Sequence, residues 1–297
     1  MPPKQITRVT AFAGKGGVGK TTCAAATALY SASQGQKTLA ISTDATPSLA
    51  HIFETAAGSE PVRVTDNLYF SEIGVEEARR MWDGKFGRDV FQVFFSFVDI
   101  AYADFVDFMA SVLPGLAEEF MVDHIRELAE KGGYDAIVWD TAPLGQTMAL
   151  LATPALLTRH LRMAPRIYAR LKAVTETKEP ILNIIGRWER LSDADMYFLC
   201  NNVEFNIVAI AEALSINQLD GILAEMNKYR FKARRLIINN VVGSTDSGFL
   251  QQKAAQQTGY LEMLRNSYGH LKIIELPLFP HEVKGLEKLR RVAEILY

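Results

Sequence analysis

Cysteine is scarce in this chain of 297 residues, and its two cysteines, Cys23 and Cys200, lie far apart. Two cysteines at this spacing form neither a disulfide framework nor a metal-ligand pattern. Cys23 falls on an expected helix and is most simply a small buried residue. The scarcity fits a reducing compartment, so we expect a cytoplasmic protein.

Long apolar runs and a strong net charge are also missing. The nearest approach to a membrane span, Val90 to Leu113, is interrupted by three aspartates, so we expect no segment that crosses a membrane. The N-terminus has no apolar stretch of signal-peptide type. Lysine and arginine total 32 against 34 aspartates and glutamates, so the net charge does not predict binding to nucleic acid.

A glycine-rich loop at residues 14–21 matches the phosphate-binding pattern G-x-x-x-x-G-K-[ST]. Lys20 would place an ammonium against the β and γ oxygens of a nucleotide, and Thr21 would offer a hydroxyl to Mg²⁺. An expected strand at residues 6–13 and an expected helix from Thr21 flank the loop, so a helix N-terminus faces the anion. The backbone N–H groups turn inward at four glycines, Gly14, Gly16, Gly17 and Gly19.

Aspartates follow two further expected strands, at residues 37–43 and 134–140. Ligands of open α/β sheets bind at the carboxyl ends of the strands. Asp140 ends an apolar strand in the Walker B arrangement and would hold Mg²⁺ through a water, and Gly145 would bring a backbone N–H to the γ-phosphate. For Asp44 two interpretations stay open, because it could position the attacking water or cap the next turn.

The remaining pattern predicts an α/β fold with a parallel, mostly doubly wound sheet and helices on both faces. The length and the hydrophobic share of 48% fit a single P-loop ATPase domain over residues 1–297 with insertions. We expect the insertions, at about 75–132 and 155–202, to form an α-helical subdomain. Further strands are expected at residues 68–73, 204–210, 234–242 and 270–276, and helices at 215–229, 246–268 and 287–296.

Two stretches of the expected helical subdomain carry unusual side chains. The apolar residues from Phe91 to Met109 would occupy more than one face of a helix. This stretch is therefore either buried in the protein's own core or in contact with an apolar partner. A second stretch places four arginines on one helix face, which favours a solvated cationic face over a partner or membrane-surface role. These are Arg159, Arg162, Arg166 and Arg170.

Three motifs, GKGGVGKTT, STDATPSL and DTAPLGQTMALL, occur in this order along the chain. Together with Ile237–Asn240 and Pro277–Gly285, they resemble the arsenical-pump ATPase family, which includes the ATPases that target tail-anchored membrane proteins. Lys15 resembles the second lysine of the deviant Walker A loop, with a solvated surface lysine as the alternative. The resemblance covers nearly the whole chain and implies a homodimeric clamp driven by Mg²⁺ and ATP.

The resemblance also implies a role for single positions. Lys15 would reach the partner's nucleotide, Asp44 would activate the attacking water, and Asp140 would belong to switch II. We therefore expect Asp44, Lys15 and Lys20 to be catalytic, and Asn239 to read the adenine edge. Nucleotide contacts are expected along the loop, Val18 and the phosphate-contacting Thr22 included, while the base would lie under Pro277, Leu278 and Phe279.

The chain departs from the family pattern at several positions. The histidine of switch I is absent from residues 44–49, and Gln146 stands where switch II often has histidine. Residues 244–247 replace the paired cysteines that bind zinc between subunits, so we expect no zinc. The cysteines that bind trivalent arsenic are missing too, and residues 155–202 are short for a full client groove.

We expect a homodimer that uses ATP to bind and release an apolar helical client, and the main expectation is the targeting of tail-anchored membrane proteins. We expect this homodimer in the cytoplasm, with peripheral attachment to a membrane as an option. A membrane receptor could take the client's place as partner. One alternative is an ATPase subunit that energises an arsenite or other anion pump. Another is a partition-type ATPase acting on a membrane or DNA surface, although we expect no nucleic acid. The amphipathic stretch from Lys284 to Leu296 would suit a membrane surface, but it also matches the family's closing helix.

Overall fold

The computed structural model describes residues 6–43, 48–58, 60–89, 91, 102, 116–141, 181–243 and 246–297. The chain divides into two compact units. The sheet unit comprises Met1–Ile73, Leu128–Met148 and Cys200–Tyr297. The helical unit comprises Gly74–Glu127 and Ala149–Leu199.

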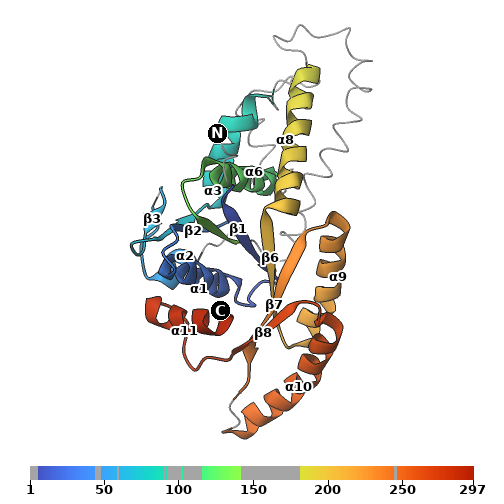
Figure 1. The fold of residues 1–297 in the computed structure, drawn as a ribbon. Helices are drawn as coiled ribbons and strands as arrows, with labels where there is room; N and C mark the ends of the chain where they lie inside the picture. Colours follow the sequence, from blue (N-terminus) through green and yellow to red (C-terminus); the bar gives the residue numbers. More distant parts are fainter. Residues whose placement is uncertain are drawn as a thin grey trace. The chain divides into compact units, whose positions relative to one another are not determined.

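An eight-stranded sheet in the order β3-β4-β2-β5-β1-β6-β7-β8 forms the centre of the sheet unit (Figure 1). All neighbouring strands run parallel except the edge pair β3–β4. The expected α/β fold with a mostly parallel sheet is therefore confirmed. The strands are β1 (Arg8–Gly14), β2 (Thr38–Ser42), β3 (Val62–Arg63), β4 (Leu68–Glu72), β5 (Ala136–Asp140), β6 (Val203–Ile210), β7 (Lys232–Val241) and β8 (Lys272–Pro277).

The central strands are apolar because both faces of the sheet are covered. Every residue of β2 is buried, which is the pattern of a parallel strand between two helical layers. β1 pairs with β5 on one side and with β6 on the other. The strand order therefore reverses at β1, and such a reversal opens a crevice at the carboxyl ends of the strands.

Helices cover the two faces of this sheet. α1 (Lys20–Ser33) and α11 (Leu286–Leu296) lie together on one face, and α9 (Ala213–Tyr229) and α10 (Gly248–Tyr268) lie on the other (Figure 1). The short α2 (Leu49–Phe53) follows β2. The bounds of α1, α9, α10 and α11 agree with the expected helices within a few residues, as terminal assignments normally do, whereas α2 was not expected.

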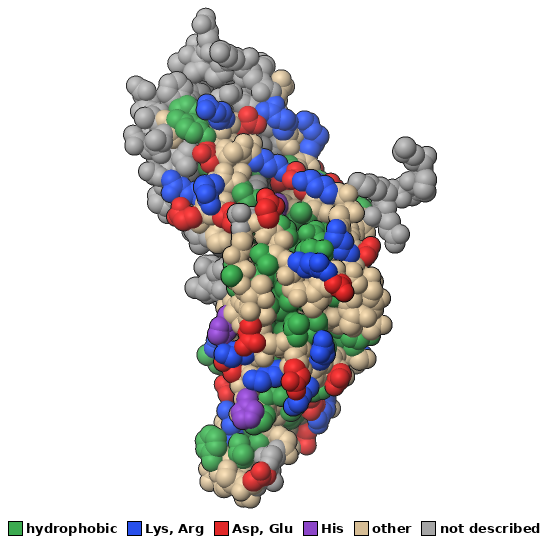
Figure 2. All heavy atoms as spheres, turned by 90° about the vertical axis from the view of Figure 1, so that its left-hand side faces the viewer, with side chains coloured by type: hydrophobic (Ala, Val, Ile, Leu, Met, Phe, Trp, Pro, Cys, Tyr) green, Lys and Arg blue, Asp and Glu red, His purple; other side chains and the backbone are tan. Residues whose placement is uncertain are grey.

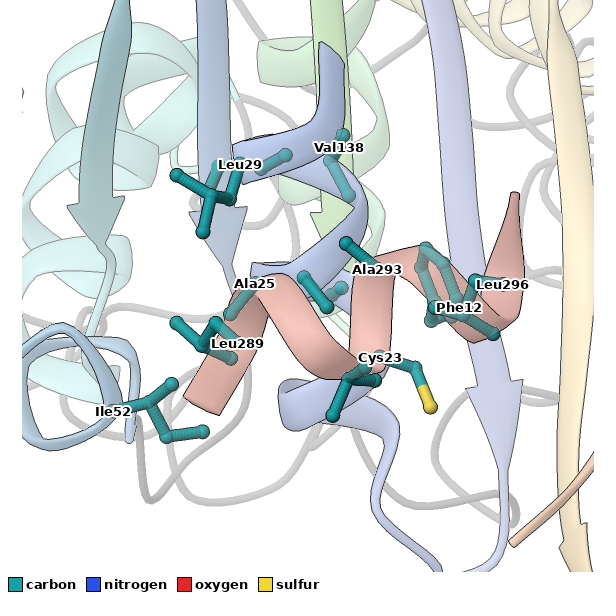
Figure 3. Close-up of a cluster of buried hydrophobic side chains, with 14 of the residues drawn as sticks. Phe12, Cys23, Ala25, Leu29, Ile52, Val138, Leu289, Ala293 and Leu296 are labelled. Carbon is teal, nitrogen blue, oxygen red and sulfur yellow. The ribbon is translucent and has the colours of Figure 1, made fainter. Parts of the chain in front are cut away.

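Small and branched apolar side chains fill the space between α1, α11 and the sheet. Ala25 and Leu29 of α1 meet Leu289 and Ala293 of α11, and Phe12 of β1 lies in the same cluster (Figure 3). The run of buried alanines in α1 lets that helix approach both neighbours closely. Each fully buried leucine stabilises the fold by roughly 1.5–3 kcal/mol relative to exposure.

The described part of the helical unit contains α3 (Val75–Trp82), the π-helical turn η1 (Asp83–Gly87), most of α6 (Leu116–Lys131) and most of α8 (Ile181–Asn201). The Tyr102 hydroxyl donates a hydrogen bond to Asp83 at the start of η1. A side chain at Gly87 would collide with both of these groups. A larger residue at Gly87 would therefore displace the hydrogen bond between Tyr102 and Asp83.

Acidic and basic side chains are buried between η1, α6 and α8. Lys85 donates to Asp123, and Arg126 donates to both Asp123 and Asp195. The two aspartates are almost fully buried. Buried charges persist when they are paired and hydrogen-bonded, and this cluster pairs each aspartate with at least one cation.

Three sequence expectations need correction or fall outside the described residues. The short edge strand β3 was not expected, so the strand at 68–73 is the fourth along the chain rather than the third. The helical reading of 75–132 missed the π-helical turn. Residues 92–101 and 103–115, with most of the aromatic stretch, and residues 155–180, with the arginine face, lie outside the described residues.

Within the described part of the chain, no helix combines the length and apolar character that a membrane crossing requires.

Candidate active site

The phosphate-binding loop connects β1 to α1 at the carboxyl edge of the sheet. Gly14 has φ 154°, and a side chain there would lie 2.2 Å from the backbone oxygen of Val208 on β6. Gly19 precedes α1 in the left-handed region, with φ 98°. The loop is thus pressed against β6 and turns directly into the helix, which aims the first free N–H groups of α1 at the loop's interior.

Lys20, the first residue of α1, is unusual as a buried cation. Its side chain is 6% exposed, and Nζ donates a 3.1 Å hydrogen bond to the carbonyl oxygen of Lys15. The ammonium is therefore held over the loop that precedes it. A buried ammonium at a helix N-terminus strongly favours an anionic ligand.

Asp140 ends β5 beside this loop and is 1% exposed. Its Oδ2 accepts a 3.1 Å hydrogen bond from the hydroxyl of Ser42 at the end of β2. Burial, and then the charge of Asp140, raise the pKa of Cys23 on α1 to about 12, so this thiol stays protonated and unreactive. In the sheet, Asp140 is the register partner of Phe12 on β1, two residues before the loop begins.

Asn239 approaches the loop from the end of β7. Its Nδ2 donates a 2.9 Å hydrogen bond to the carbonyl oxygen of Val18. A side chain at Gly19 would lie 2.3 Å from the same nitrogen. The next residue, Asn240, has φ 58°, a left-handed conformation that asparagine tolerates better than most residues. Asn239 therefore contacts the loop itself.

A cavity of about 640 Å³ opens over the loop and α1. Its size suits a small-molecule cofactor. Nine of the residues expected to bind a nucleotide line it: Gly16, Gly17, Gly19, Lys20, Thr21, Thr22, Asn239, Leu278 and Phe279. Four others do not line it, although they lie in the same segments: Gly14, Lys15, Val18 and Pro277. Val18 instead packs into the core.

The cavity has further walls that sequence reasoning did not assign. His51 of α2 and Glu282, which follows β8, meet through Nε2 and Oε1 at 3.1 Å. The hydrogen bond with His51, and then Lys284, lower the pKa of Glu282. The backbone N–H of Gly285 donates to Ile52 at 2.8 Å, so α2 is joined to the segment after β8. The family-like sequence PLFPHEVKG indicated in advance that the segment after β8 belongs to the site. No sequence motif indicated that His51 belongs to it.

Two expected site residues, Asp44 and Gly145, lie outside the described residues, and their roles stay predictions. The described walls combine two kinds of chemistry. Lys20, two threonines and the loop glycines form a polar end that suits phosphates. Leu276, Leu278 and Phe279 form an apolar end that suits a planar base. The arrangement can hold a nucleoside phosphate.

Comparison with known proteins places the chain in a family. The profile of a family described as anion-transporting ATPase matches residues 7–297. A protein of Chlorobaculum tepidum that bears the provisional name arsenical pump-driving ATPase is 28% identical over 310 residues, covering 98% of this chain and 75% of the relative. The Paramecium tetraurelia protein ATPase ASNA1 homolog 2 is 26% identical, covering 95% of this chain and 91% of the relative.

ATPase GET3A of Arabidopsis thaliana is 28% identical over 296 residues, covering 93% of this chain and 80% of the relative. The family match spans both units, and it includes the loop, the end of β5 and the segment after β8 that form the site. The chain belongs to the anion-transporting ATPase family, and its activity is that of an ATPase.

Proposed function

We propose that the cavity binds ATP with Mg²⁺ and that hydrolysis drives a homodimeric, cytoplasmic clamp that targets tail-anchored membrane proteins. The observation that carries the nucleotide site is the buried Lys20 beneath the inward-facing loop. Thr21 would hold Mg²⁺ through its hydroxyl and Asp140 would hold it through a water, while phosphate oxygens would complete its shell. The ion would neutralise charge that develops on the transferred phosphoryl group.

Asn239 supports adenine as the base. Its Nδ2 donates one N–H to Val18, so Oδ1 and the second N–H of Nδ2 are the groups left to pair with a ligand in the cavity. The exocyclic amine of adenine donates, whereas the equivalent oxygen of guanine accepts. An asparagine amide pairs with adenine by accepting a hydrogen bond from this amine and donating one to the neighbouring ring nitrogen.

Dimerisation would complete the site. Lys15 does not line the cavity of its own chain, which agrees with a side chain that serves the partner's nucleotide. Closure of two subunits would then add positive charge as the transition state develops. Without paired cysteines at residues 244–247, the dimer would form without zinc.

The central test compares two site variants. Lys20→Ala should abolish nucleotide binding or turnover, because it removes the buried charge that faces the phosphates. Asp44→Asn should bind ATP with wild-type affinity and lose hydrolysis, because the attacking water is no longer activated. Binding is followed by calorimetry, turnover by phosphate release, and dimerisation by light scattering. Hydrolysis by Asp44→Asn at the wild-type rate would contradict the mechanism.

The client would bind the helical unit, because apolar residues of its aromatic stretch occupy more than one face of a helix and two such surfaces that meet across a two-fold axis would form one groove. Wild-type protein should capture a tail-anchored substrate in the presence of ATP, whereas Phe94→Asp or Phe105→Asp should fail and still hydrolyse ATP. Phe91 and Tyr102 pack edge to face at 5.0 Å, so substitutions there would disturb the unit itself. Equal capture by wild type and variants would leave the stretch as core.

The names of several relatives favour one second candidate, a subunit that energises an anion pump. That function predicts faster ATP turnover with an added oxyanion in the same assay. A DNA-surface role has less support, because basic and acidic side chains are interspersed on the face shown in Figure 2. Such mixing opposes a continuous basic stripe.

A further inference from the structure

Gln257 is a buried polar residue in a helix whose neighbouring positions face solvent. Its exposed fraction is 3%, while Gln256 and Thr258 on either side are exposed. The amide reaches away from α10 to the carboxyl end of β7. A buried amide at this place needs a reason, because α10 could have filled the position with an apolar side chain.

Both ends of the Gln257 amide bind the backbone of β7. Oε1 accepts a 2.9 Å hydrogen bond from the N–H of Val242, and Nε2 donates a 3.0 Å hydrogen bond to the carbonyl oxygen of Asn240. Asn240 lies where the pairing of β7 with β8 shifts register, between Ile238 and Val241, and Val242 directly follows β7. The side chain thus supplies hydrogen bonds at a point where the ladder is interrupted.

The irregular end of β7 also carries Asn239. Asn239 precedes the left-handed Asn240 and donates to Val18 inside the phosphate-binding loop. Gln257 is therefore connected to the loop by a series of two hydrogen bonds, Gln257 to Asn240 and Asn239 to Val18, joined by the peptide bond between Asn239 and Asn240. α10 reaches the nucleotide cavity through this series without lining it.

We propose that Gln257 is a positioning residue for the nucleotide: it fixes the bulged end of β7 so that Asn239 braces the phosphate-binding loop and faces the base. This role rests on the proposed ATP site. Gln257 touches neither the cavity nor the reacting atoms, so its loss weakens nucleotide binding and leaves the chemical step largely intact. The effect of Gln257 passes through Asn239.

The test uses Gln257→Met, which keeps the length and volume of the side chain and removes both hydrogen bonds. The Kd and KM for ATP should rise about three- to tenfold, as expected for the loss of one or two hydrogen bonds, while kcat stays within about twofold. Gln256→Met, next to it on the exposed face, is the matched control and should change neither. Gln257→Glu keeps the acceptor for Val242 and should fall between wild type and Gln257→Met.

A double-mutant cycle separates positioning from a general packing defect. If Gln257 acts through Asn239, then Gln257→Met should add no further loss of affinity to Asn239→Ala. Hydrogen exchange of the loop amides, measured without nucleotide, should be faster in Gln257→Met and unchanged in Gln256→Met. A Gln257→Met protein with wild-type Kd and wild-type loop exchange would overturn the inference, and so would additive losses in the cycle. Failure of wild-type protein to bind ATP would instead overturn the proposed function.

Discussion

The interiors of the two units are stabilised by different kinds of interaction, apolar packing in one and ion pairs in the other. In the sheet unit, α1 and α11 meet through alanine, leucine and valine side chains. In the helical unit, η1, α6 and α8 meet around Lys85, Asp123, Arg126 and Asp195. An apolar interface is stabilised in proportion to the apolar surface it buries, and it tolerates many combinations of side chains of similar total volume. A buried ionic cluster tolerates few combinations, because each charge needs a partner in the correct position.

The difference bears on what each unit does. The sheet unit must keep one loop in one place, and apolar close packing provides that rigidity. In the helical unit, burial alone would lower the pKa of Lys85, but its hydrogen bonds with Asp123 and Glu127 raise it above its ordinary value. The cluster therefore holds its charges as a set, so disturbing one member affects the others.

The largest expected effect comes from removing the shared cation. Arg126→Ala would leave Asp123 and Asp195 with less compensation in a buried site, and breaking a buried pair in this way costs about 3–5 kcal/mol of unfolding free energy. Hydrogen exchange during urea denaturation should show the loss in peptides of α6 and α8. Arg291→Ala, which breaks an exposed pair with Glu287, is the control and should cost no more than about 0.5 kcal/mol.

A companion variant sharpens the contrast. Replacing Asp123, Arg126 and Asp195 together by leucine, methionine and leucine removes the charges along with their desolvation. If the cluster serves specificity rather than stability, this triple variant should regain much of the stability that Arg126→Ala loses. A triple variant as unstable as Arg126→Ala would show that the ions themselves stabilise the unit.

The next effect concerns the apolar interface. Leu289→Ala should destabilise the sheet unit by about 2–5 kcal/mol, because Leu289 is fully buried between α11 and α1 and its removal leaves a cavity. Leu289→Met keeps the volume and should cost less than about 1.5 kcal/mol. Equal losses in the two variants would mean that this interface is as selective as the ionic cluster.

The smallest effect, taken per pH unit, is a pH dependence that belongs to the helical unit. Burial, with a further contribution from the charge of Asp123, raises the pKa of Asp195 from 3.8 to about 7, against the opposing hydrogen bond from Arg126. The folded state thus binds this proton more tightly than the unfolded state. The stability that Asp195 contributes is complete below pH 3.8 and is lost as the pH rises through about 7.

Asp195→Asn tests this dependence, because asparagine stays neutral at every pH. Relative to wild type, the variant should gain stability as the pH rises between about 4 and 7, by at most about 1.4 kcal/mol per pH unit. Denaturation of both proteins across this range measures the difference. Parallel pH profiles for the two proteins would show that Asp195 is already ionised in the folded state.

Much of the sheet unit could be predicted because its strands and its loop are local patterns. β2 is buried throughout and reads as an apolar run, and the glycine loop carries its motif in eight consecutive residues. β3 has two residues, too few to show any period. A wide turn such as η1 leaves no mark in the hydrophobic pattern either.

The interactions that sequence reasoning missed join residues far apart in the chain. Gln257 sits among polar residues of α10, so nothing local distinguishes it from the exposed Gln256. The pairing of Arg126 with Asp195 spans 69 positions, and that of His51 with Glu282 spans 231. Such partners are set by the topology of the sheet and by helix packing, which a single sequence reveals only indirectly. Asp44 and Gly145 remain predictions.

The two outer strands of the sheet have a consequence for self-association. One edge is β3, with only two residues, one of them Arg63, which pairs with the exposed Asp66. The other edge is β8, which begins with an exposed lysine and ends in proline. Short, charged or proline-containing borders resist strand addition from another molecule. Two copies of this chain would therefore associate through loops and helices rather than by extending one continuous sheet.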